Sequence, residues 1–300
     1  MQEHIAHAQE ESALYNNCIK EALENGSRHF TFDFSQNVNI PHHARQMGPL
    51  YFLSLPKIQI FGFRIDDIPK QLNFLIDEHE TIDCDGTNTH GPDSVISMID
   101  WSFSQYGTGD RKITIHADNC SGQNKNQFVI GYLMWRIMTG QQDEITYMMQ
   151  VPGHTRCIID GGFALIKKLY RRSDCDSIDQ LERIVEQSSV ANSTVRYPAW
   201  QWRERKAFLS EYFKPLKGIR KYHHFCFQST EPGTVTVKES VSSEEMKINI
   251  LKDRNCVFNQ DRPAIIQPTG LSDARKQYLF TKVRLFVRPA QQDMTGRPPE

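Results

Sequence analysis

Residues 29–39 read HFTFDFSQNVN, and the interpretation of the whole chain starts from this stretch. Large apolar and polar side chains alternate along it, which predicts a β-strand with one face against a core. Asp33 lies in the middle of this strand, between Phe32 and Phe34. Aspartate is depleted in strand interiors, and a buried carboxylate without a partner is costly. We therefore expect a cation beside Asp33, and a metal ion is one candidate.

The segments that follow predict an α/β fold with a mixed sheet flanked by helices. Two further strands are expected from the apolar runs, after which helices and strands alternate. The predicted elements are strand 50–65 with a bend at Pro56, strand 71–78, helix 92–106, strand 111–117, helix 127–139, strand 144–151, a helix directly after Asp160, and helix 177–188. From strand 29–39 to the helix after Asp160 the order is β-β-β-α-β-α-β-α, that of the ribonuclease H fold, in which right-handed crossovers extend an antiparallel meander.

The chain divides into four regions on this basis. We expect a lead-in helix at 1–27, a ribonuclease-H-like core at 28–190, a mixed C-terminal extension at 191–290 and a disordered tail at 291–300. The extension is predicted to contain a short helical piece at 200–213, a strand pair at 222–227 and 234–241, and a helix-like stretch at 272–286. No internal repeat is visible in the sequence.

The composition is that of a soluble globular protein, with 39% hydrophobic and 24% charged residues. Its seven cysteines are scattered and form no CxxC pair, so we expect reduced thiols in a nuclear or cytoplasmic protein that is not secreted. The polar, acidic N-terminus resembles neither a signal nor a transit peptide. The longest apolar stretch, 128–138, covers about half a membrane span and contains Arg136, which excludes a transmembrane helix.

Charge is distributed unevenly along the chain, although the net charge is only −1. Residues 1–155 hold 10 basic against 19 acidic residues, 156–222 hold 14 against 8, and 223–300 hold 11 against 9. An acidic half followed by a basic segment suits a metal-binding carboxylate cluster beside a phosphate-binding face. An ordinary mixed surface is the alternative interpretation.

Two further aspartates are predicted to share a pocket with Asp33. Asp118 follows the strand that ends at Ala117, and Asp160 stands directly before a helix. In the predicted fold the strands of Asp33 and Asp118 are neighbours, and the helix after Asp160 packs over their ends. Such a cluster could hold two Mg²⁺ or Mn²⁺ ions for phosphoryl transfer. The structural alternatives are a helix N-cap for Asp160 and a strand-end turn for Asp118.

Polar and basic residues beside the acids predict contacts with nucleic acid. The turn at 119–126, NCSGQNKN, is dense in amide donors and leads into a helix N-terminus, where a phosphate could bind. The helix after Asp160 ends in the basic tract KKLYRR. The expected contact residues are Asn119, Gln123, Asn124, Lys125, Lys167, Lys168, Arg171 and Arg172. A capped loop and a solvated helix end are the structural alternatives.

His154 lies in the turn before Asp160, where an imidazole could transfer a proton or help the product leave. A structural role is the alternative for this residue. His154 and Cys157, together with Cys120 or the pair His223 and His224, could instead form a zinc site. No second pair has the usual ligand spacing, so a zinc-stabilised interaction domain is the weakest of the interpretations.

Several stretches together resemble an uncharacterised domain family of transposon-type reading frames in fungi and animals, over roughly residues 28 to 260. They are FDFSQNVNIPHHARQMGPLYFLSLPKIQIFG, NFLIDE, HADNCSGQNKN, GYLMWRIMTG, VPGHTRCIIDGGFALIKKLYRR and GIRKYHHFCF. Members resemble ribonuclease-H-like DDE/DDD transposases, which implies cut-and-paste or strand-transfer chemistry on DNA. Carried onto this chain, the acids of the family are Asp33, Asp118 and Asp160. Longer relatives carry a Cys/His-bearing region before the core, so we expect a fragment or a domesticated gene.

Two functional hypotheses follow. The first is a transposase- or integrase-like nuclease that performs metal-dependent phosphoryl transfer on DNA, with Asp33, Asp118 and Asp160 as metal ligands and His154 assisting. The second is a catalytically inactive, transposon-derived module that binds nucleic acid or protein. DNA is the expected partner, membranes are not, and a homo-oligomer is compatible with either hypothesis.

Overall fold

The computed structural model describes residues 2–25, 27–45, 47–82, 87–107, 109–150, 157–256, 258 and 262–298. The strands of the main sheet are β1 (Arg28–Phe34), β2 (Val38–Asn39), β3 (Lys57–Ile65), β4 (Lys70–Ile76), β5 (Lys112–Ala117), β6 (Glu144–Met149), β7 (Asn192–Arg196), β9 (His224–Gln228), β10 (Thr234–Lys238) and β11 (Met246–Asn249). The longer helices are α1 (Gln2–Asn25), α2 (Pro92–Tyr106), α3 (Gln127–Met138), α4 (Ile158–Tyr170), α5 (Ile178–Ser188) and α6 (Arg205–Tyr212).

The strands pair in the order β11-β10-β9-β6-β5-β1-β3-β4-β7, with β2 joined to β3 alone. The first three long strands, β1, β3 and β4, form an antiparallel meander. β5 and β6 extend it in parallel from β1, and β7 runs parallel to β4 at the other side. β9, β10 and β11 continue antiparallel beyond β6. The prediction of an α/β fold with a mixed sheet is therefore confirmed.

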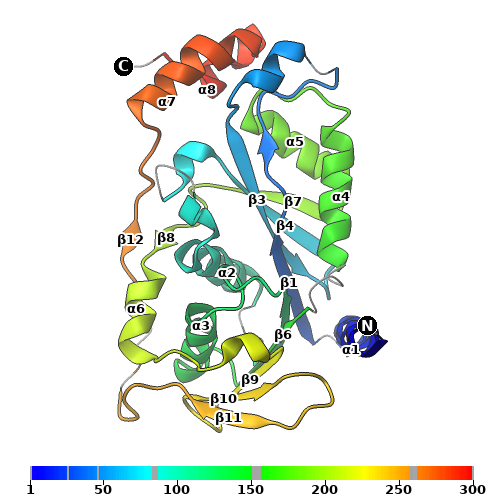
Figure 1. The fold of residues 1–300 in the computed structure, drawn as a ribbon, viewed down its shortest axis with the longest axis vertical. Helices are drawn as coiled ribbons and strands as arrows, with labels where there is room; N and C mark the ends of the chain where they lie inside the picture. The colour runs from blue at the N-terminus through cyan, green and yellow to red at the C-terminus, as the bar shows by residue number, and fades with distance from the viewer. Residues whose placement is uncertain are drawn as a thin grey trace.

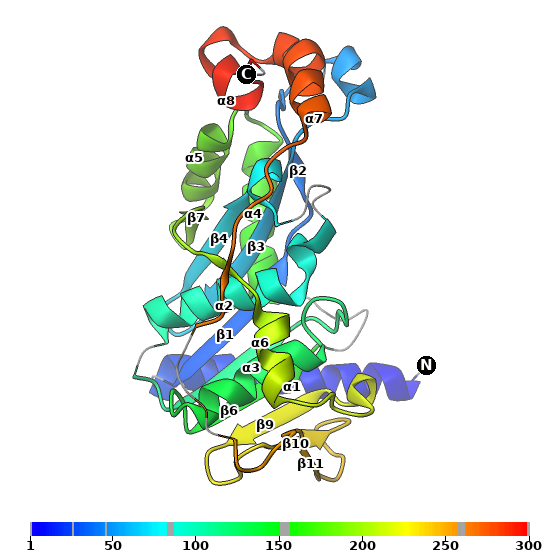
Figure 2. The ribbon, with the colours of Figure 1, turned by 90° about the vertical axis from the view of Figure 1, so that its left-hand side faces the viewer.

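Helices cover both faces of this sheet (Figure 1). One face packs against α2 and α3, on which α6 packs in turn, and its core contains aromatic side chains such as Phe30, Phe63 and Trp202. Figure 2 shows this side, with α2, α3 and α6 in front of the strands. The opposite face carries α4 and α5, whose core includes Ile60, Phe163 and Leu181. None of the described helices is long and apolar enough to cross a membrane.

The first two predicted strands differ from the structure in their extent. The stretch 29–39 is divided, because β1 ends at Phe34 and the short β2 is a separate strand. β2 pairs only with the first two residues of β3, Lys57 and Ile58. The predicted strand 50–65 begins only at Lys57. The preceding segment forms the 3-10 helix η1 (Gly48–Phe52), with a proline in its first turn, and leaves Tyr51 and Phe52 exposed. The bend expected at Pro56 is therefore the start of the strand.

The C-terminal region contributes strands to the same sheet, whereas the sequence predicts a separate extension at 191–290. The expected strand pair is present as β9 and β10, but β9 adds directly to β6. β7 and β11 were not predicted, because NSTVR has no alternation of apolar residues, and MKIN alternates over only four residues. The helical piece at 200–213 is reduced to α6, since Trp202 and Arg203 form β8 (Trp202–Arg203), which pairs with β12 (Ile265–Ile266).

The last part of the chain is more ordered than its composition suggested. The predicted helix at 272–286 is α7 (Asp273–Tyr278) followed by the π-helix η5 (Leu279–Val283) and the 3-10 helix η6 (Arg284–Phe286). The stretch 291–300, expected to be disordered, contains the short helix α8 (Gln292–Thr295). The hydroxyl of Thr295 donates to the carbonyl of Asp176, and Arg284 pairs with Asp293, so polar contacts anchor this segment without an apolar pattern.

A buried polar chain links α1 to the sheet on the α4 side. Nδ1 of His29 lies 2.6 Å from Asp66, and its Nε2 lies 2.8 Å from Nδ1 of His116. Tyr15 of α1 packs edge-on against both imidazoles. Burial lowers the pKa of His116 well below its usual value, and the neighbouring His29 and His224 lower it further. The folded protein thus keeps His116 neutral at pH values where the unfolded chain would protonate it.

We predict that this histidine makes the fold acid-sensitive. Its contribution to stability is complete above the unfolded pKa of 6.5 and is lost as the pH falls below it, because only the unfolded state takes up the proton. The loss approaches about 1.4 kcal/mol per pH unit. Between pH 7 and pH 5, the free energy of unfolding of the wild type should therefore fall by about 1–2 kcal/mol more than that of His116→Asn. Equal falls in chemical denaturation at the two pH values would contradict this.

A second prediction concerns Gly62 in the middle of β3. A Cβ there would lie 2.5 Å from Cζ of Phe163 and 2.9 Å from Cδ1 of Ile159, both on α4. Gly62→Ala should destabilise the protein by about 1–3 kcal/mol, because the buried ring has to move. Gly161→Ala on the same helix meets nothing within 4 Å and should stabilise it by up to about 1 kcal/mol. The melting temperatures of both variants test whether α4 packs directly on Gly62. If Gly62→Ala melted at the temperature of the wild type, α4 would not pack against this position.

Candidate functional site

Asp33 and Asp118 are brought together by the parallel pairing of β1 and β5. Phe32 of β1 lies opposite Ala117 of β5 in this pairing. One residue further along each strand are Asp33 and Asp118, so the two aspartates extend the same register on neighbouring strands, which are typically ~4.8 Å apart. Both side chains are half-buried. They share the sheet face that carries α4, because alternate residues of a strand face opposite sides and Phe32 belongs to the other core.

Asp160 approaches this pair from the first turn of α4. The partner of Asp33 on β3 is Gly62, and the absence of a side chain there lets Ile159 and Phe163 pack directly on the strand. This close packing seats the start of α4 beside Asp33. The expectation that Asp160 precedes the helix is corrected by the structure, because the N-cap is Cys157 and Asp160 is the third helical residue. Sequence analysis missed Gly62 and Cys157, although a glycine inside the apolar run IFGF signals a close approach.

The electrostatics of Asp33 reflect the proximity of the other two acids. Burial raises the pKa of Asp33 to about 7, and the charges of Asp118 and Asp160 also raise it, against the backbone N–H of Phe34, which lowers it. An aspartate titrates normally near 3.8, so the raised pKa favours the protonated form of Asp33 far more than in an exposed aspartate when no cation is bound. The charges of Asp118 and Asp160 therefore act unfavourably on an ionised Asp33, and a positive ion would relieve this repulsion.

Each of the three carboxylates has one oxygen held by a local hydrogen bond. Oδ1 of Asp33 accepts from the N–H of Phe34 at 2.7 Å. Oδ2 of Asp160 accepts from the N–H of Cys157 at 2.9 Å, which completes a capping box. Oδ1 of Asp118 accepts from the N–H of Cys120 at 3.2 Å and from the side-chain amide of Asn124. These bonds orient the carboxylates through their own loops and involve only one oxygen of each.

The side chains of this site have the chemistry that a divalent metal ion prefers, but the present distances between them do not suit one. Mg²⁺ and Mn²⁺ prefer carboxylate and amide oxygens, which this site supplies. The side-chain oxygen of Asn124, buried beside Asp118, has no hydrogen-bond partner among the described residues. Within the described ranges, however, no three His, Cys, Asp or Glu side chains are grouped closely enough to hold a metal. A metal would thus have to draw the acids together.

The turn after Asp118 is a network of side-chain contacts as well as a capped loop. Nδ2 of Asn119 lies 3.1 Å from Nε2 of His223, and the amide of Gln123 contacts Nδ1 of His90 at 2.8 Å. Asn126 caps α3 by accepting from the N–H groups of Phe128 and Val129. Asn119 and Gln123 remain partly exposed, whereas Asn124 is buried and serves Asp118. Of the three predicted amide contacts, Asn124 is therefore corrected to a supporting residue of the acid site.

Lys125 is also corrected. Its side chain is only 2% exposed, and its ammonium group donates to the carbonyl oxygen of Arg220 at 2.8 Å. Burial lowers the pKa of this lysine to about 8. The sequence placed Lys125 in a polar turn, and nothing in NCSGQNKN shows that the chain at 218–222 closes over it. Lys125 thus ties two loops together and does not present its charge to a ligand.

The basic tract of α4 lies on the surface as expected. Lys168, Arg171 and Arg172 are exposed, and the half-buried Lys167 reaches the side-chain oxygen of Gln36 at 3.3 Å. Lys167 is seven residues after Asp160, roughly 10 Å along the helix axis. One helix therefore carries both an acid of the site at its start and the cationic groups at its end.

The zinc interpretation finds no support in the described part of the chain. His154 lies in the stretch 151–156, outside the described residues. Sγ of Cys157 lies 3.4 Å from Asp160, and His224 contacts Glu11 of α1 at 2.8 Å. His223 contacts Asn119 and the carbonyl of Glu239. Cys157, His223 and His224 thus have other partners, and each described cysteine, Cys120 included, is a free thiol.

We predict that Asp33 costs the metal-free protein stability. Because the folded pKa of Asp33 is raised, its contribution is fully present below pH 3.8 and is lost as the pH rises towards 7. Asp33→Asn keeps the acceptor for Phe34 and should stabilise the protein by on the order of 1–3 kcal/mol at pH 8 in EDTA, with a smaller gain at pH 5. Chemical denaturation at both pH values measures this gain.

The matched control for this prediction is Asp143→Asn, because Arg111 lowers the pKa of that exposed carboxylate. This variant should bring no stabilisation at either pH. If Asp33→Asn proved no more stable than the wild type at pH 8, the three acids would not share one space.

Comparison with known proteins gives one match. A family model described as a domain of unknown function (DUF7869) matches residues 81–245, more than half of the chain. The matched region contains Asp118 and the helix α4 with its Asp160 and basic tract. Asp33 precedes the matched region. No curated protein and no solved structure matches the chain. On the strength of the family match, the chain belongs to the family of proteins with this domain of unknown function, DUF7869.

Proposed function

We propose that the chain performs metal-dependent phosphoryl transfer on DNA, as a nuclease of the transposase or integrase type with a ribonuclease-H-like core. The observation that supports the proposal is the approach of two acids from distant parts of the sequence to Asp33: the charges of Asp118 and Asp160 both raise its pKa, although the described side chains are not grouped closely enough to hold a metal as they stand. Asp33 and Asp118 extend one strand register, and Asp160 enters from the helix seated on Gly62. Acids that repel one another in this way are typical of sites that bind cations and perform chemistry.

The sheet supports the proposed core. The strand order β4-β3-β1-β5-β6, with an antiparallel meander followed by two parallel strands, is the arrangement expected for a ribonuclease-H-like domain. The positions of the acids are compatible with the proposed core: Asp33 is within the first strand, Asp118 follows β5, and Asp160 is in the first turn of α4. The descent from a mobile element remains part of the proposal and rests on the sequence resemblance.

The residues of the chain divide the work in this proposal. Asp33 and Asp118 offer oxygens from the sheet, and Asp160 offers one from α4. Asn124 and the N–H of Cys157 each hold one oxygen of Asp118 and of Asp160, and these bonds leave the second oxygen of each carboxylate available to an ion. A divalent ion bound there would activate the attacking oxygen and stabilise the leaving oxygen. Lys168, Arg171 and Arg172, further along α4, provide positive charge for the DNA backbone.

A second candidate is a DNA-binding module without turnover, and one observation favours it. The described His, Cys, Asp and Glu side chains contain no group of three arranged for a metal. In a domesticated copy the acids could persist for structural reasons, for example the capping box of Asp160. Such a protein would bind DNA through the same basic tract and would not respond to Mg²⁺ or Mn²⁺.

We predict that the purified chain cleaves plasmid and single-stranded DNA in Mn²⁺ or Mg²⁺, and that Asp118→Asn lowers the rate about a hundredfold or more. The amide keeps an acceptor for Cys120 and Asn124, so folding should remain intact. Mn²⁺ should also raise the melting temperature of the wild type more than that of Asp118→Asn, because only the folded wild type binds the ion well.

Asp273→Asn is the matched control for the cleavage assay, since that side chain is 98% exposed and belongs to α7. It should cleave like the wild type. Full cleavage by pure Asp118→Asn would remove this residue from the mechanism. DNA binding without cleavage and without a metal-dependent rise in melting temperature would establish the non-catalytic alternative.

A further inference from the structure

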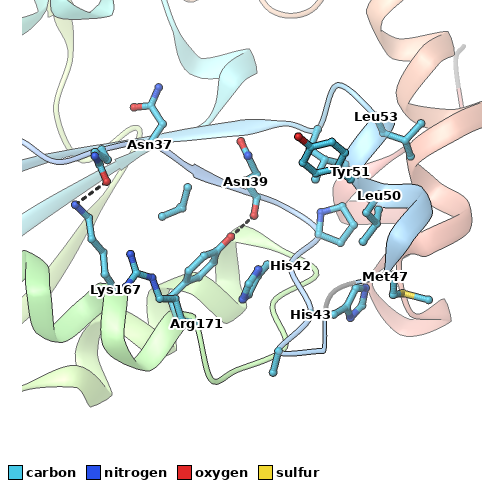
Figure 3. Close-up of a pocket in the computed structure, with 16 residues that line it drawn as sticks. Asn37, Asn39, His42, His43, Met47, Leu50, Tyr51, Leu53, Lys167 and Arg171 are labelled. Carbon is cyan, nitrogen blue, oxygen red and sulfur yellow. Dashed lines mark hydrogen bonds between the residues drawn. The ribbon is translucent and has the colours of Figure 1, made fainter.

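A pocket of about 660 Å³ opens beside the C-terminal half of α4. Its walls come from the segment between β1 and β3 and from α4, so residues far apart in sequence meet there (Figure 3). The described lining residues include two cations, several amides and exposed aromatic or aliphatic side chains, but no Asp or Glu. The volume is in the range that encloses a small organic molecule. Sequence analysis named only the two cations among these residues.

The α4 wall of the pocket is positively charged. Lys167 and Arg171, one helical turn apart, both face it (Figure 3). His42 stacks on Tyr170 and adds no charge at neutral pH, because burial lowers its pKa. His43 lies 4.0 Å from Asp174, but that carboxylate also pairs with Arg288 at 3.7 Å. The pocket therefore attracts anions through Lys167 and Arg171.

The opposite wall offers flat apolar surface. Tyr51 of η1 lines the pocket with 75% of its surface exposed, and the neighbouring Phe52 is 84% exposed. Their rings meet edge-to-face, with centroids 5.3 Å apart. These two adjacent aromatic residues are exposed to solvent, so they lack the stabilisation that burial of an aromatic ring normally provides. Unstacked nucleobases are ligands that recover it, since every base has a flat π-face.

The pocket is continuous with the acid site along two elements. Gln36, at its edge, is three residues after Asp33 and so no more than about 11 Å along the chain. On the other side α4 leads from Asp160 to Lys167 and Arg171. Gln36 and Lys167 contact each other across this path at 3.3 Å. A strand that placed a phosphate at the acids would reach the pocket within a few nucleotides.

We propose that this pocket binds a single-stranded nucleic-acid segment next to the scissile phosphate, with backbone phosphates on Lys167 and Arg171 and a base stacked on Tyr51. The inference rests on the proposed function for the position of the scissile phosphate, but the binding itself does not require cleavage. The size of the pocket and the aromatic wall favour unpaired nucleotides, because the bases of a duplex are stacked on one another and their faces are unavailable. Asn37 and Asn39 supply further polar groups along the same wall.

The test measures binding to the full chain carrying Asp118→Asn, in EDTA, so that no probe is cut. The probes are a fluorescein-labelled 12-nucleotide oligothymidine and a labelled duplex of mixed sequence, followed by fluorescence anisotropy. We expect tighter binding of the single strand. Tyr51→Ala should weaken it about tenfold, whereas Tyr51→Phe should retain it. Replacing Lys167 and Arg171 together by alanine should weaken it and reduce the slope of log K against log salt by about 1.4.

The charge-matched control replaces Lys214 and Lys217 by alanine, since both are exposed, follow α6 and do not line the pocket. This variant should bind oligothymidine as the parent does. Equal or tighter binding of the duplex, or equal losses in the Lys214/Lys217 variant, would overturn the inference. So would a fluorescein-labelled polyglutamate peptide that binds more tightly than oligothymidine with the same dependence on Tyr51. If the wild type cleaved DNA but the binding results differed from those expected, only the pocket inference would be refuted. If the binding results were as expected but the wild type did not cleave DNA, only the proposed chemistry would be refuted.

Discussion

The parallel pairing of β1 with β5 is the constraint on which the rest of the site depends. Hydrogen bonds between the two strands place Phe32 opposite Ala117. Because of this register, the next residues along each strand, Asp33 and Asp118, lie close to each other. A slip by one residue would turn one aspartate to the opposite face of the sheet. The aromatic core on that face, with Phe30 and Phe32 fully buried, prevents such a slip. Hydrophobic packing on one side of the sheet therefore maintains an unfavourable concentration of charge on the other.

The helix α4 converts this pair into a larger surface. Its first turn reaches the sheet because Gly62 leaves room for Phe163, and its last turn lies beside the chain that leaves β1. The helix is amphipathic: Ile159, Phe163 and Ile166 are buried, while its basic residues lie outside. The acid site, the cationic tract and the aromatic wall thus all adjoin α4 or the segment that leaves β1. Stability is given up at Asp33, as is common where a site is preorganised for a ligand.

The sequence predicted the fold class and the first eight core elements because their signals are local. Alternation marks β1 and β5, and the 3.6-residue period marks α2 and α3. It failed where tertiary contacts decide. The polar NSTVR becomes β7 because β4 offers a free edge, and Lys125 is buried by a distant loop. Asp33 could be singled out because aspartate is unusual inside a strand. The pocket could not, because Tyr51 was expected in a strand and its exposure depends on η1.

The strands contributed by the last third of the chain have one more consequence. β9 covers the open edge of β6, and β7 covers that of β4, so the two ends of the central sheet are closed by segments made late in synthesis. A chain stopped at residue 190 would expose two rows of unpaired amide and carbonyl groups, which other chains could join. Lys247, on the outermost strand β11, pairs with Glu231 and keeps a charge at that border. The C-terminal strands thereby pair with edges that the first 190 residues would leave open, and the sheet is continuous across the core and its extension.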